Sequence, residues 1–326
     1  MAYSESVLAR ASARLAEEKQ LHEAQNRSRI QAIFEKLPRL AEIDRTLRGT
    51  SAKIMAACFK NSESPETAMA RLKEENLSLQ EERNWILESN DLDPEDLEDT
   101  PICTVCGGTG YVGAVMCGCL RELCRQEQKK ELSSLLGTGR ESFDRFRLDL
   151  YPDETDAELG VSPRTLMEYV LSNAQHYAKT FGEKSGSILM LGATGLGKTY
   201  LSACIAKTVS DRGYSVVYET AGKVFADFEA EKFACHGENE DHTRKYFDCD
   251  LLILDDLGTE MTTQFTVAAL YQIVNRRLLA SRATIISSNL AANDLERRYN
   301  AQIASRLLGT YELYQFRGKD IRMIEK

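Results

Sequence analysis

The sequence has no long apolar segment: within its 326 residues, no run approaches the roughly 20 apolar residues that a membrane-spanning helix needs. Residues 1–18 carry charges where a signal peptide requires an apolar core, which argues against secretion. Basic residues are outnumbered, 41 against 50 acidic ones, and the net charge of −9 argues against a broad basic surface for duplex DNA. A local basic groove for a single strand is still compatible with this balance. We therefore expect a cytoplasmic protein with no membrane partner.

Internal repeats and low-complexity tracts are also absent, so the organisation of the chain has to be taken from local composition. Residues 1–99 are rich in Ala, Glu, Leu, Arg and Lys and end in an acidic stretch, which predicts an N-terminal helical domain of two or three helices. Leu72, Leu79 and Ile86 recur at every seventh position, as in a coiled-coil hairpin over residues 66–88. This domain is either a self-contained bundle or a docking arm for another protein. The regions expected to follow are a cysteine knuckle over 100–124, a charged connector over 125–145 and a larger domain over 146–326.

Four of the nine cysteines are packed into a short segment, which suits a metal site in a reducing compartment better than a disulfide scaffold. Cys103 and Cys106 form one close pair, Cys117 and Cys119 form a second, and glycines between the pairs allow tight turns. Four thiolates can close a tetrahedral zinc site, and no histidine or carboxylate is placed to leave an open catalytic position, so we expect structural Zn²⁺. The alternatives are unligated thiols, a redox pair, or replacement of one ligand by Cys124.

A glycine-rich segment between an apolar run and a helix-like stretch fits the phosphate-loop pattern G-x-x-x-x-G-K-[ST] completely. Its glycines let backbone N–H groups curl around a phosphate, Lys198 supplies charge to the β- and γ-oxygens of ATP, and the Thr199 hydroxyl can ligate Mg²⁺. A helix expected over about 199–210 adds its dipole. The alternative is a chance glycine-rich turn. The predicted nucleotide-binding residues are Gly192, Ala193, Thr194, Gly195, Leu196, Gly197, Lys198 and Thr199.

Strand-like apolar runs alternate with helical patterns from residue 146 onward, which predicts an α/β fold with a parallel sheet flanked by helices. Asp255 and Asp256 follow one of these runs directly. The carboxyl ends of parallel strands lie on the same side of a sheet, so both aspartates are expected near the phosphate loop. Asp255 can then hold Mg²⁺ while Asp256 orients or deprotonates water. An ordinary strand running into an acidic turn is the other interpretation. The strands are expected over 187–191, 215–218, 251–254 and 284–288.

Two further polar residues follow or interrupt apolar segments. Asn289 ends a buried strand and would sit between the acidic pair and the γ-phosphate, or else is a solvated strand-end asparagine. Arg306 lies within an apolar helix and needs an anion, because burying an unpaired charge is costly. That anion is either a surface carboxylate or the γ-phosphate of a neighbouring subunit.

In this order, the motifs resemble those of the helicase-loader branch of the AAA+ ATPases, the DnaC/DnaI-type proteins, and of the related transposase helper IstB. The resemblance runs over about residues 102–322 and includes the cysteine knuckle, the phosphate loop, the Asp255–Asp256 strand, the Ser-Arg-Leu box at Arg306 and the closing segment that ends at Arg322. It implies an AAA+ P-loop fold and ATP-controlled loading of the hexameric replicative helicase onto single-stranded DNA. The N-terminal helices would dock the helicase, with the knuckle bracing them.

The same resemblance implies roles for single residues. Lys198 and Thr199 fall on Walker A, Asp255 and Asp256 on Walker B, Asn289 on sensor 1 and Arg306 on an arginine finger that acts between assembled subunits. Asp256 stands where many relatives have the longer Glu, so we expect slow hydrolysis and a switch rather than a motor. Gln302 replaces an arginine of many relatives, which puts a second contact between subunits in doubt, and Arg322 has no assigned role.

The resemblance also points to the segment 221–228 for single-stranded DNA, with Lys223, Phe225 and Phe228 as candidate contacts. A plain amphipathic helix with Phe225 and Phe228 in the core is the competing interpretation. Two other functions stay open: an IstB-like or phage-type ATPase helper of another DNA enzyme, and a nucleotide-gated adaptor that binds protein only.

Overall fold

The computed structural model describes residues 3–50, 65–135, 141–157, 160–233 and 243–323. The chain forms two compact units, one made of residues 13–119 and the other of residues 1–12 together with 120–326. The predicted boundaries after residues 99, 124 and 145 divide the chain more finely and stay a prediction. No helix among the described residues is both long enough and apolar enough to span a bilayer.

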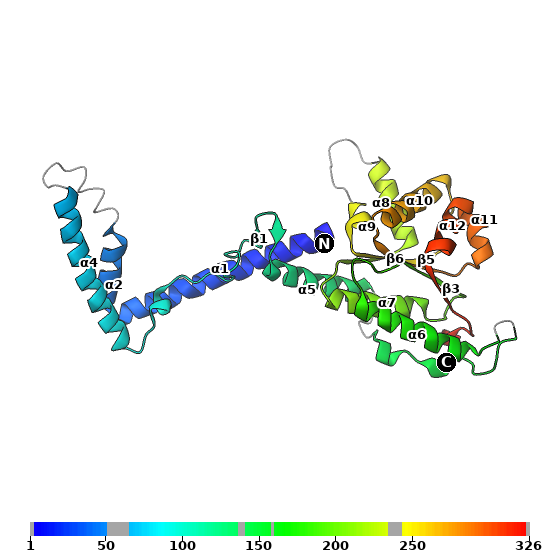
Figure 1. Cartoon of the computed structure of the whole chain (residues 1–326), viewed down its shortest axis with the longest axis horizontal. Helices are drawn as coiled ribbons and strands as arrows, with labels where there is room; N and C mark the ends of the chain where they lie inside the picture. The colour runs from blue at the N-terminus through cyan, green and yellow to red at the C-terminus, as the bar shows by residue number, and fades with distance from the viewer. Residues whose placement is uncertain (1–2, 51–64, 136–140, 158–159, 234–242, 324–326) are drawn as a thin grey trace. The chain divides into compact units, whose positions relative to one another are not determined.

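The larger unit is built on a five-stranded parallel sheet with the strand order β4-β5-β6-β3-β7 (Figure 1). β3 and β6 lie in the interior of the sheet and are buried along their whole length, which explains why their sequences are continuously apolar or small. The predicted α/β fold is therefore confirmed, although β7 was not expected and β5 runs past both aspartates instead of ending before them. The strands are β3 (Ile188–Leu191), β4 (Val216–Thr220), β5 (Leu251–Leu257), β6 (Ala283–Ser288) and β7 (Glu312–Gln315).

Helices cover both faces of this sheet, and alternate residues of each strand point to opposite faces. Ile188 and Met190 of β3 pack with α6 and α7, whereas Leu189 and Leu191 pack with α8, α10 and α12. The two helical layers are seen below and above the sheet in Figure 1. The helices are α5 (Gly118–Leu135), α6 (Pro163–Thr180), α7 (Lys198–Asp211), α8 (Ala221–Phe233), α9 (Arg244–Asp248), α10 (Gln264–Leu279), α11 (Ala292–Tyr299) and α12 (Ala301–Thr310), with short 3-10 turns η2 (Phe143–Arg145), η3 (Leu148–Leu150) and η4 (Ile321–Met323).

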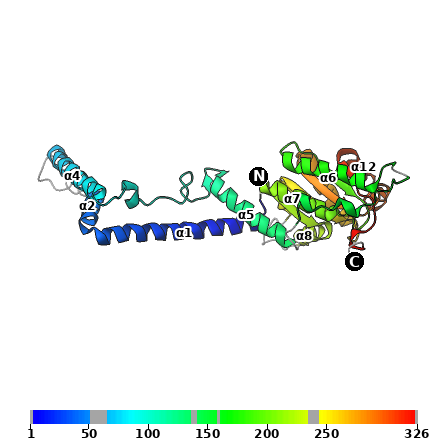
Figure 2. The ribbon, with the colours of Figure 1, turned by 90° about the horizontal axis from the view of Figure 1, so that it is seen from below.

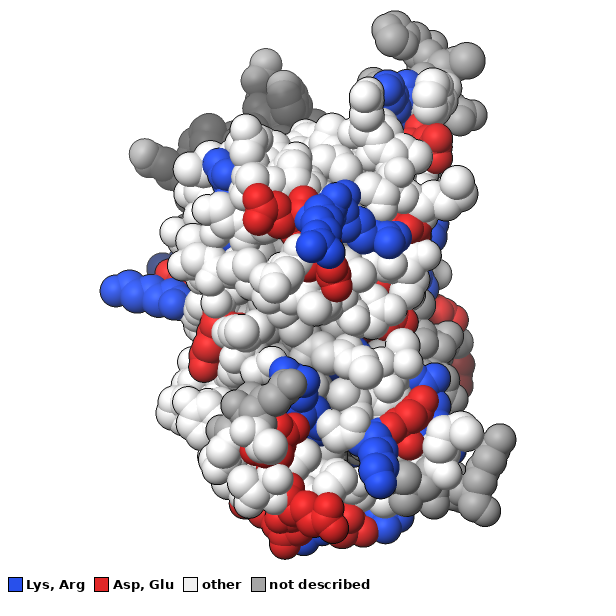
Figure 3. All heavy atoms as spheres, turned by 90° about the vertical axis from the view of Figure 1, so that its right-hand side faces the viewer, with Lys and Arg blue, Asp and Glu red and all other residues white. Residues whose placement is uncertain are grey.

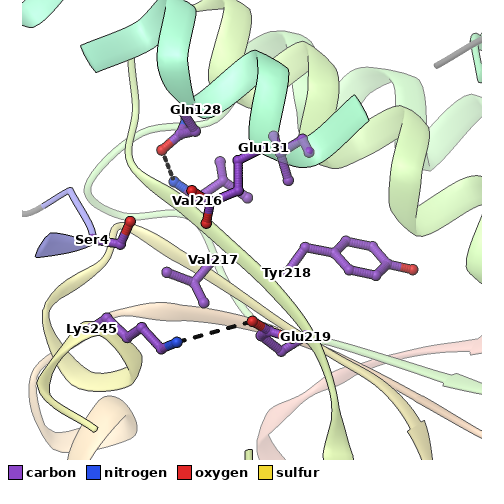
Figure 4. A pocket seen from close by; sticks show the side chains of 9 residues that line it. Ser4, Gln128, Glu131, Val216, Val217, Tyr218, Glu219 and Lys245 are labelled. Atoms are coloured by element: carbon purple, nitrogen blue, oxygen red, sulfur yellow. Dashed lines mark hydrogen bonds and ion pairs between the residues drawn. The ribbon is translucent and has the colours of Figure 1, made fainter. Parts of the chain in front are cut away.

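β4 forms one edge of the sheet, and a side chain from α5 covers its first residue (Figure 4). The Gln128 side-chain oxygen accepts a hydrogen bond from the Val216 N–H at 3.0 Å. Its amide group donates to Ser210 Oγ at 2.6 Å and to the Tyr214 carbonyl at 3.0 Å. Gln128 thus satisfies a backbone donor that would otherwise be exposed at an edge strand. Farther along β4, Lys245 pairs with Glu219 at 4.0 Å.

The smaller unit is mainly helical. α2 (Pro38–Arg48) and α4 (Pro65–Glu88) lie side by side, as both ribbon views show (Figures 1 and 2). Ile86 of the predicted heptad is in their shared core and Leu79 packs against it, while the side chain of Leu72 is outside the described residues. The remaining elements are α1 (Glu5–Lys36), which contributes to both units, the 3-10 turn η1 (Pro94–Leu97), and the hairpin of β1 (Tyr111–Val112) and β2 (Val115–Met116).

Candidate nucleotide site and metal centre

The predicted phosphate loop connects β3 to α7, and its glycines adopt conformations that other residues avoid. Gly195 and Gly197 have φ of +74° and +88°. A Cβ at Gly192 would lie 2.5 Å from the Phe316 carbonyl oxygen. The loop therefore needs glycine both for its path and because a second segment of the chain lies directly against it.

Lys198 is the first residue of α7, and its side chain is folded back over the loop. Its ammonium donates to the Gly192 carbonyl at 2.6 Å and to the Ala193 carbonyl at 2.8 Å. Burial lowers the pKa of Lys198, while the charges of Asp256 and Asp255 act in the opposite direction. The cation is held by neutral acceptors inside a loop of backbone amides, and Thr199 is exposed beside it. This donor set suits an anion with several oxygens.

The two aspartates of β5 occupy different environments. Asp255 is 3% exposed and accepts hydrogen bonds from Tyr218 Oη at 2.8 Å and from Ser287 Oγ. Asp256 points outward with φ +55°, and its N–H donates to Ser287 Oγ at 3.0 Å. The register with β6 shifts between Leu254 and Leu257, so this outward turn is a bulge in the strand.

The charge environment of Asp256 differs from that of an exposed surface carboxylate. Burial is the largest cause that raises the pKa of Asp256, and the Asp255 charge raises it further. Lys198 and Arg322 lower it. Asp255 is thus a buried carboxylate held by two hydroxyl donors, while Asp256 is an exposed carboxylate with a raised pKa.

Asn289 follows β6, the strand between β5 and β3 in the sheet. Its side chain is exposed and lies near the turn after β5, where a Cβ on Gly258 would be 3.1 Å from Asn289 Oδ1. The strand order therefore brings Lys198, Asp255, Asp256 and Asn289 together at the carboxyl ends of the parallel strands, as the sequence predicted.

Arg306 lies on α12 and is turned toward α10. Its guanidinium donates to Asn275 Oδ1 at 3.2 Å and to Tyr271 Oη at 3.2 Å, and it lies 4.9 Å from the centre of the Tyr271 ring. In the described part of the chain, no carboxylate lies within ion-pair distance of Arg306. The interpretation as an intramolecular surface ion pair therefore finds no support among these residues. A third hydrogen bond of the guanidinium goes to the Gln302 carbonyl at 3.1 Å.

The structure corrects the expectation for the segment 221–228. Phe225 and Phe228 belong to α8, are 4% and 9% exposed, and pack in the core above β5. Neither ring can stack on a nucleotide base without leaving the core. Lys223 is exposed and pairs with Asp227 one turn later. The plain amphipathic helix is the interpretation that holds.

The four clustered cysteines come together as predicted. All four sulfur atoms lie within 4.8 Å of one another, with 3.9 Å between Cys103 and Cys117 and 3.4 Å between Cys106 and Cys119. Four sulfurs bound to one Zn²⁺ would be about 3.8 Å apart. Cys124 is fully buried and is not part of this group, so the structure gives no support for its replacing a ligand.

The cysteine cluster is also electrostatically suited to a cation. Burial opposes ionisation of Cys106, but hydrogen bonds from the Gly110 N–H and from Cys119 lower its pKa to about 6. Burial and the neighbouring sulfurs raise the pKa of Cys119 to about 12. Several thiols compete for one negative charge, and a divalent metal would stabilise all of them as thiolates.

Two groups of residues near the site had no role assigned to them from the sequence. Phe146 and Tyr151 stack at 6.0 Å beside Gly197, and Tyr151 Oη donates to the Leu196 carbonyl at 2.7 Å. Glu260 caps the turn after β5 by accepting from the Gly258 N–H at 2.9 Å, and Tyr299 of α11 donates to it. Isolated aromatics and a loop glutamate are too common for such contacts to be predicted from local pattern.

On the face drawn in Figure 3, basic and acidic side chains of the described residues are interspersed, and much of the surface carries neither.

Comparison with known proteins agrees with these features. Residues 174–311 match the family model for IstB-like ATP binding proteins. The chain is 22% identical over 188 residues to the replicative helicase loader DnaC of Buchnera aphidicola subsp. Schizaphis graminum, a match that covers 57% of this chain and 73% of that protein. It is 25% identical over 138 residues to DnaC of Escherichia coli strain K12, covering 42% and 56%. The match thus spans only about half the length of the Escherichia coli protein.

Two solved structures also align with part of the chain. The crystal structure of the DnaC helicase loader aligns with a TM-score of 0.43 and 19% identity, covering 54% of this chain and 98% of that one. The crystal structure of DnaI aligns with a TM-score of 0.46 and 20% identity, covering 60% of this chain and 100% of that one. The family model and the curated relatives confirm the resemblance to DnaC-type proteins that the sequence motifs indicated.

Proposed function

From the premise that residues 174–311 match the IstB-like ATP binding proteins, we propose that this chain is an AAA+ ATPase that loads the hexameric replicative helicase onto single-stranded DNA, in replication initiation or restart. The observation that carries the proposal is the convergence of Lys198, Asp255, Asp256 and Asn289 at one edge of a parallel sheet. The curated relatives are named replicative helicase loaders, which supports the choice of partner.

The chain's own groups fit ATP and Mg²⁺. The glycine conformations of the loop and the neutral partners of Lys198 suit a phosphate chain, which would replace the carbonyl contacts of the ammonium. Thr199 and Asp255 would hold Mg²⁺, whose positive charge offsets that of the phosphates. Tyr218 and Ser287 fix Asp255 for this role by donating to both carboxylate oxygens.

Asp256 would orient or deprotonate the attacking water, and Asn289 would contact the terminal phosphate. The Asp256 side chain is one carbon shorter than the Glu of many AAA+ proteins, so we propose slow hydrolysis that serves as a switch. Arg306, which lacks an anionic partner among the described residues, would act on the nucleotide of an adjoining subunit in an assembled state.

The helices of the smaller unit would dock the helicase, and the four cysteines would hold structural Zn²⁺ that braces them. A second candidate is a nucleotide-gated adaptor that binds protein only. The burial of Phe225 and Phe228 favours it, because it removes the aromatic contacts expected for a single strand. An IstB-like helper of another DNA enzyme is compatible with the same family match.

One experiment separates these functions. The full chain is mixed with the replicative helicase of the same genome and a fluorescein-labelled single strand, with ATP or with ADP, and helicase bound to DNA is measured by polarisation and pull-down. A loader increases helicase on the strand with ATP, and Lys198→Ala abolishes the increase together with nucleotide binding. Helicase binding without any gain on DNA would favour the adaptor, and no helicase binding would favour a helper of another enzyme.

A further inference from the structure

Asp256 has a backbone conformation that a residue with a side chain keeps only when its surroundings fix it. Its φ of +55° lies in the left-handed region, which L-residues other than glycine adopt rarely. Its N–H donates to Ser287 Oγ at 3.0 Å, and its carbonyl accepts from Thr259 Oγ1 at 2.9 Å. The outward position of the Asp256 carboxylate therefore depends on the turn that follows it, residues 257–260.

Glu260 closes this turn with a buried carboxylate. Its side chain is 5% exposed, and Oε2 accepts a hydrogen bond from the Gly258 N–H at 2.9 Å. The same glycine has φ +108°, and a Cβ there would lie 2.9 Å from Leu290 Cγ and 3.1 Å from Asn289 Oδ1. The backbone that Glu260 holds is thus packed against the segment that carries Asn289. One carboxylate fixes the turn that lies between two polar residues of the site.

The other oxygen of this carboxylate is anchored on α11. Tyr299 is 1% exposed, and its Oη donates to Glu260 Oε1. Arg298 donates to the Glu260 carbonyl, and its Nε lies 4.0 Å from Glu260 Oε1. Burial raises the pKa of Tyr299, and the hydrogen bond and charge of Glu260 raise it further, so the phenol remains a donor at neutral pH. The turn is therefore tied to a helix whose last residue is part of the core.

We propose that Glu260 is a positioning residue for ATP hydrolysis, which holds Asp256 and Asn289 beside the terminal phosphate by anchoring their turn to α11. Glu260 itself does not contact the nucleotide, because its side chain is buried and both of its oxygens accept hydrogen bonds from the protein. The inference rests on the ATPase activity of the proposed function. It adds a residue that acts on the chemical step, where a small misplacement of the reacting groups is costly, and leaves nucleotide binding to the phosphate loop.

The test compares ATP hydrolysis with equilibrium binding of a fluorescent ATP analogue, using the full chain together with the helicase and single-stranded DNA. We expect Glu260→Ala to lower kcat about tenfold and to change the affinity for the analogue by about twofold or less. Glu260→Gln should lose less activity, because its amide oxygen can still accept from the Gly258 N–H. Glu296→Ala is the matched control, because it removes an exposed carboxylate from the same helix α11, and it should change neither quantity.

A second variant tests the anchor. Tyr299→Phe removes only the hydroxyl that donates to Glu260, so it should lower kcat in the same direction as Glu260→Gln. If the two residues act as one unit, the double variant should lose less activity than the product of the two single losses. Losses that multiply would show that Tyr299 does not act through Glu260, and the anchoring to α11 would be overturned.

The outcomes separate this inference from the function on which it rests. Equal kcat in Glu260→Ala and Glu296→Ala overturns the role of Glu260, and so does an equal loss of kcat and of analogue affinity, which a merely structural residue would produce. A parent chain that binds ATP but never hydrolyses it refutes the proposed ATPase and this role together. If the melting temperature shows that Glu260→Ala is unfolded, Glu260→Gln and Tyr299→Phe provide the same comparison.

Discussion

Replacement of Gly195 by alanine is the sharpest test of how the phosphate loop and the C-terminal segment depend on each other. The added methyl group would lie 1.8 Å from Asp320 Oδ1 and 2.2 Å from its Cγ, so the Asp320 carboxylate has to move. The alanine would also have to adopt φ +74°, a left-handed conformation that glycine tolerates and alanine does not.

The two effects can be given magnitudes. Forcing an L-residue into the left-handed region costs about 1–2 kcal/mol. Overpacking of a fitted contact costs about 1–3 kcal/mol, because neighbouring groups have to shift. We therefore expect Gly195→Ala to lower the free energy of local opening by roughly 2–5 kcal/mol.

Gly213 provides the matched control, because it has φ +91° and a Cβ added there would meet no other atom within 4 Å. Gly213→Ala should cost only about 1–2 kcal/mol, the conformational part alone. Adding Asp320→Ala to Gly195→Ala should recover most of the difference, since the group that the methyl displaces is then gone.

Hydrogen–deuterium exchange of peptides from β3 and α7 is the appropriate assay. The single tryptophan, Trp85, lies in the smaller unit, so its fluorescence reports on the wrong part of the chain. If Gly195→Ala destabilises these peptides no more than Gly213→Ala does, the contact with Asp320 contributes nothing and the reasoning is refuted.

Three further outcomes are expected. Mass spectrometry should find roughly one zinc per chain in the parent protein. Cys106→Ser should lose this zinc, whereas Cys124→Ala should keep it. The reverse result would make Cys124 a ligand in place of Cys106. Asp256→Asn should raise the melting temperature near neutral pH, because a carboxyl whose pKa is raised in the folded state destabilises the fold when it is ionised. The gain should disappear in acid, where the parent carboxyl is protonated. A gain that persists in acid would contradict this reasoning. Arg306→Ala should leave ATP affinity unchanged and remove the stimulation of turnover on assembly. The exposed Arg297→Ala should change neither the affinity nor the stimulation. Unchanged stimulation in Arg306→Ala would reject the arginine finger.

The sequence predicted those parts of the site that depend on local pattern. The glycine-rich loop, the apolar strand before the aspartates and the clustered cysteines are each contained within about ten to twenty residues, where spacing alone specifies geometry. The parallel sheet then follows from the alternation of strands and helices, and with it the meeting of Lys198 and Asp255 at one edge.

Contacts between distant segments could not be predicted in this way. Asp320 meets Gly195 although more than a hundred positions separate them, and no local feature of either residue indicates the other. Phe225 and Phe228 show a different limit: the same spacing serves a core helix and a stacking surface, and only the sheet beneath α8 decides between them. The length of β5 was underestimated because charged residues usually end a strand, whereas here a bulge turns Asp256 outward.

The amide of Gln128 restricts how copies of this chain can associate. By occupying the first backbone donor of β4, it prevents a strand from another molecule from extending the sheet in register from that end. The start of this edge strand is therefore closed by a side chain of the same molecule, and it offers no free backbone donor to another chain.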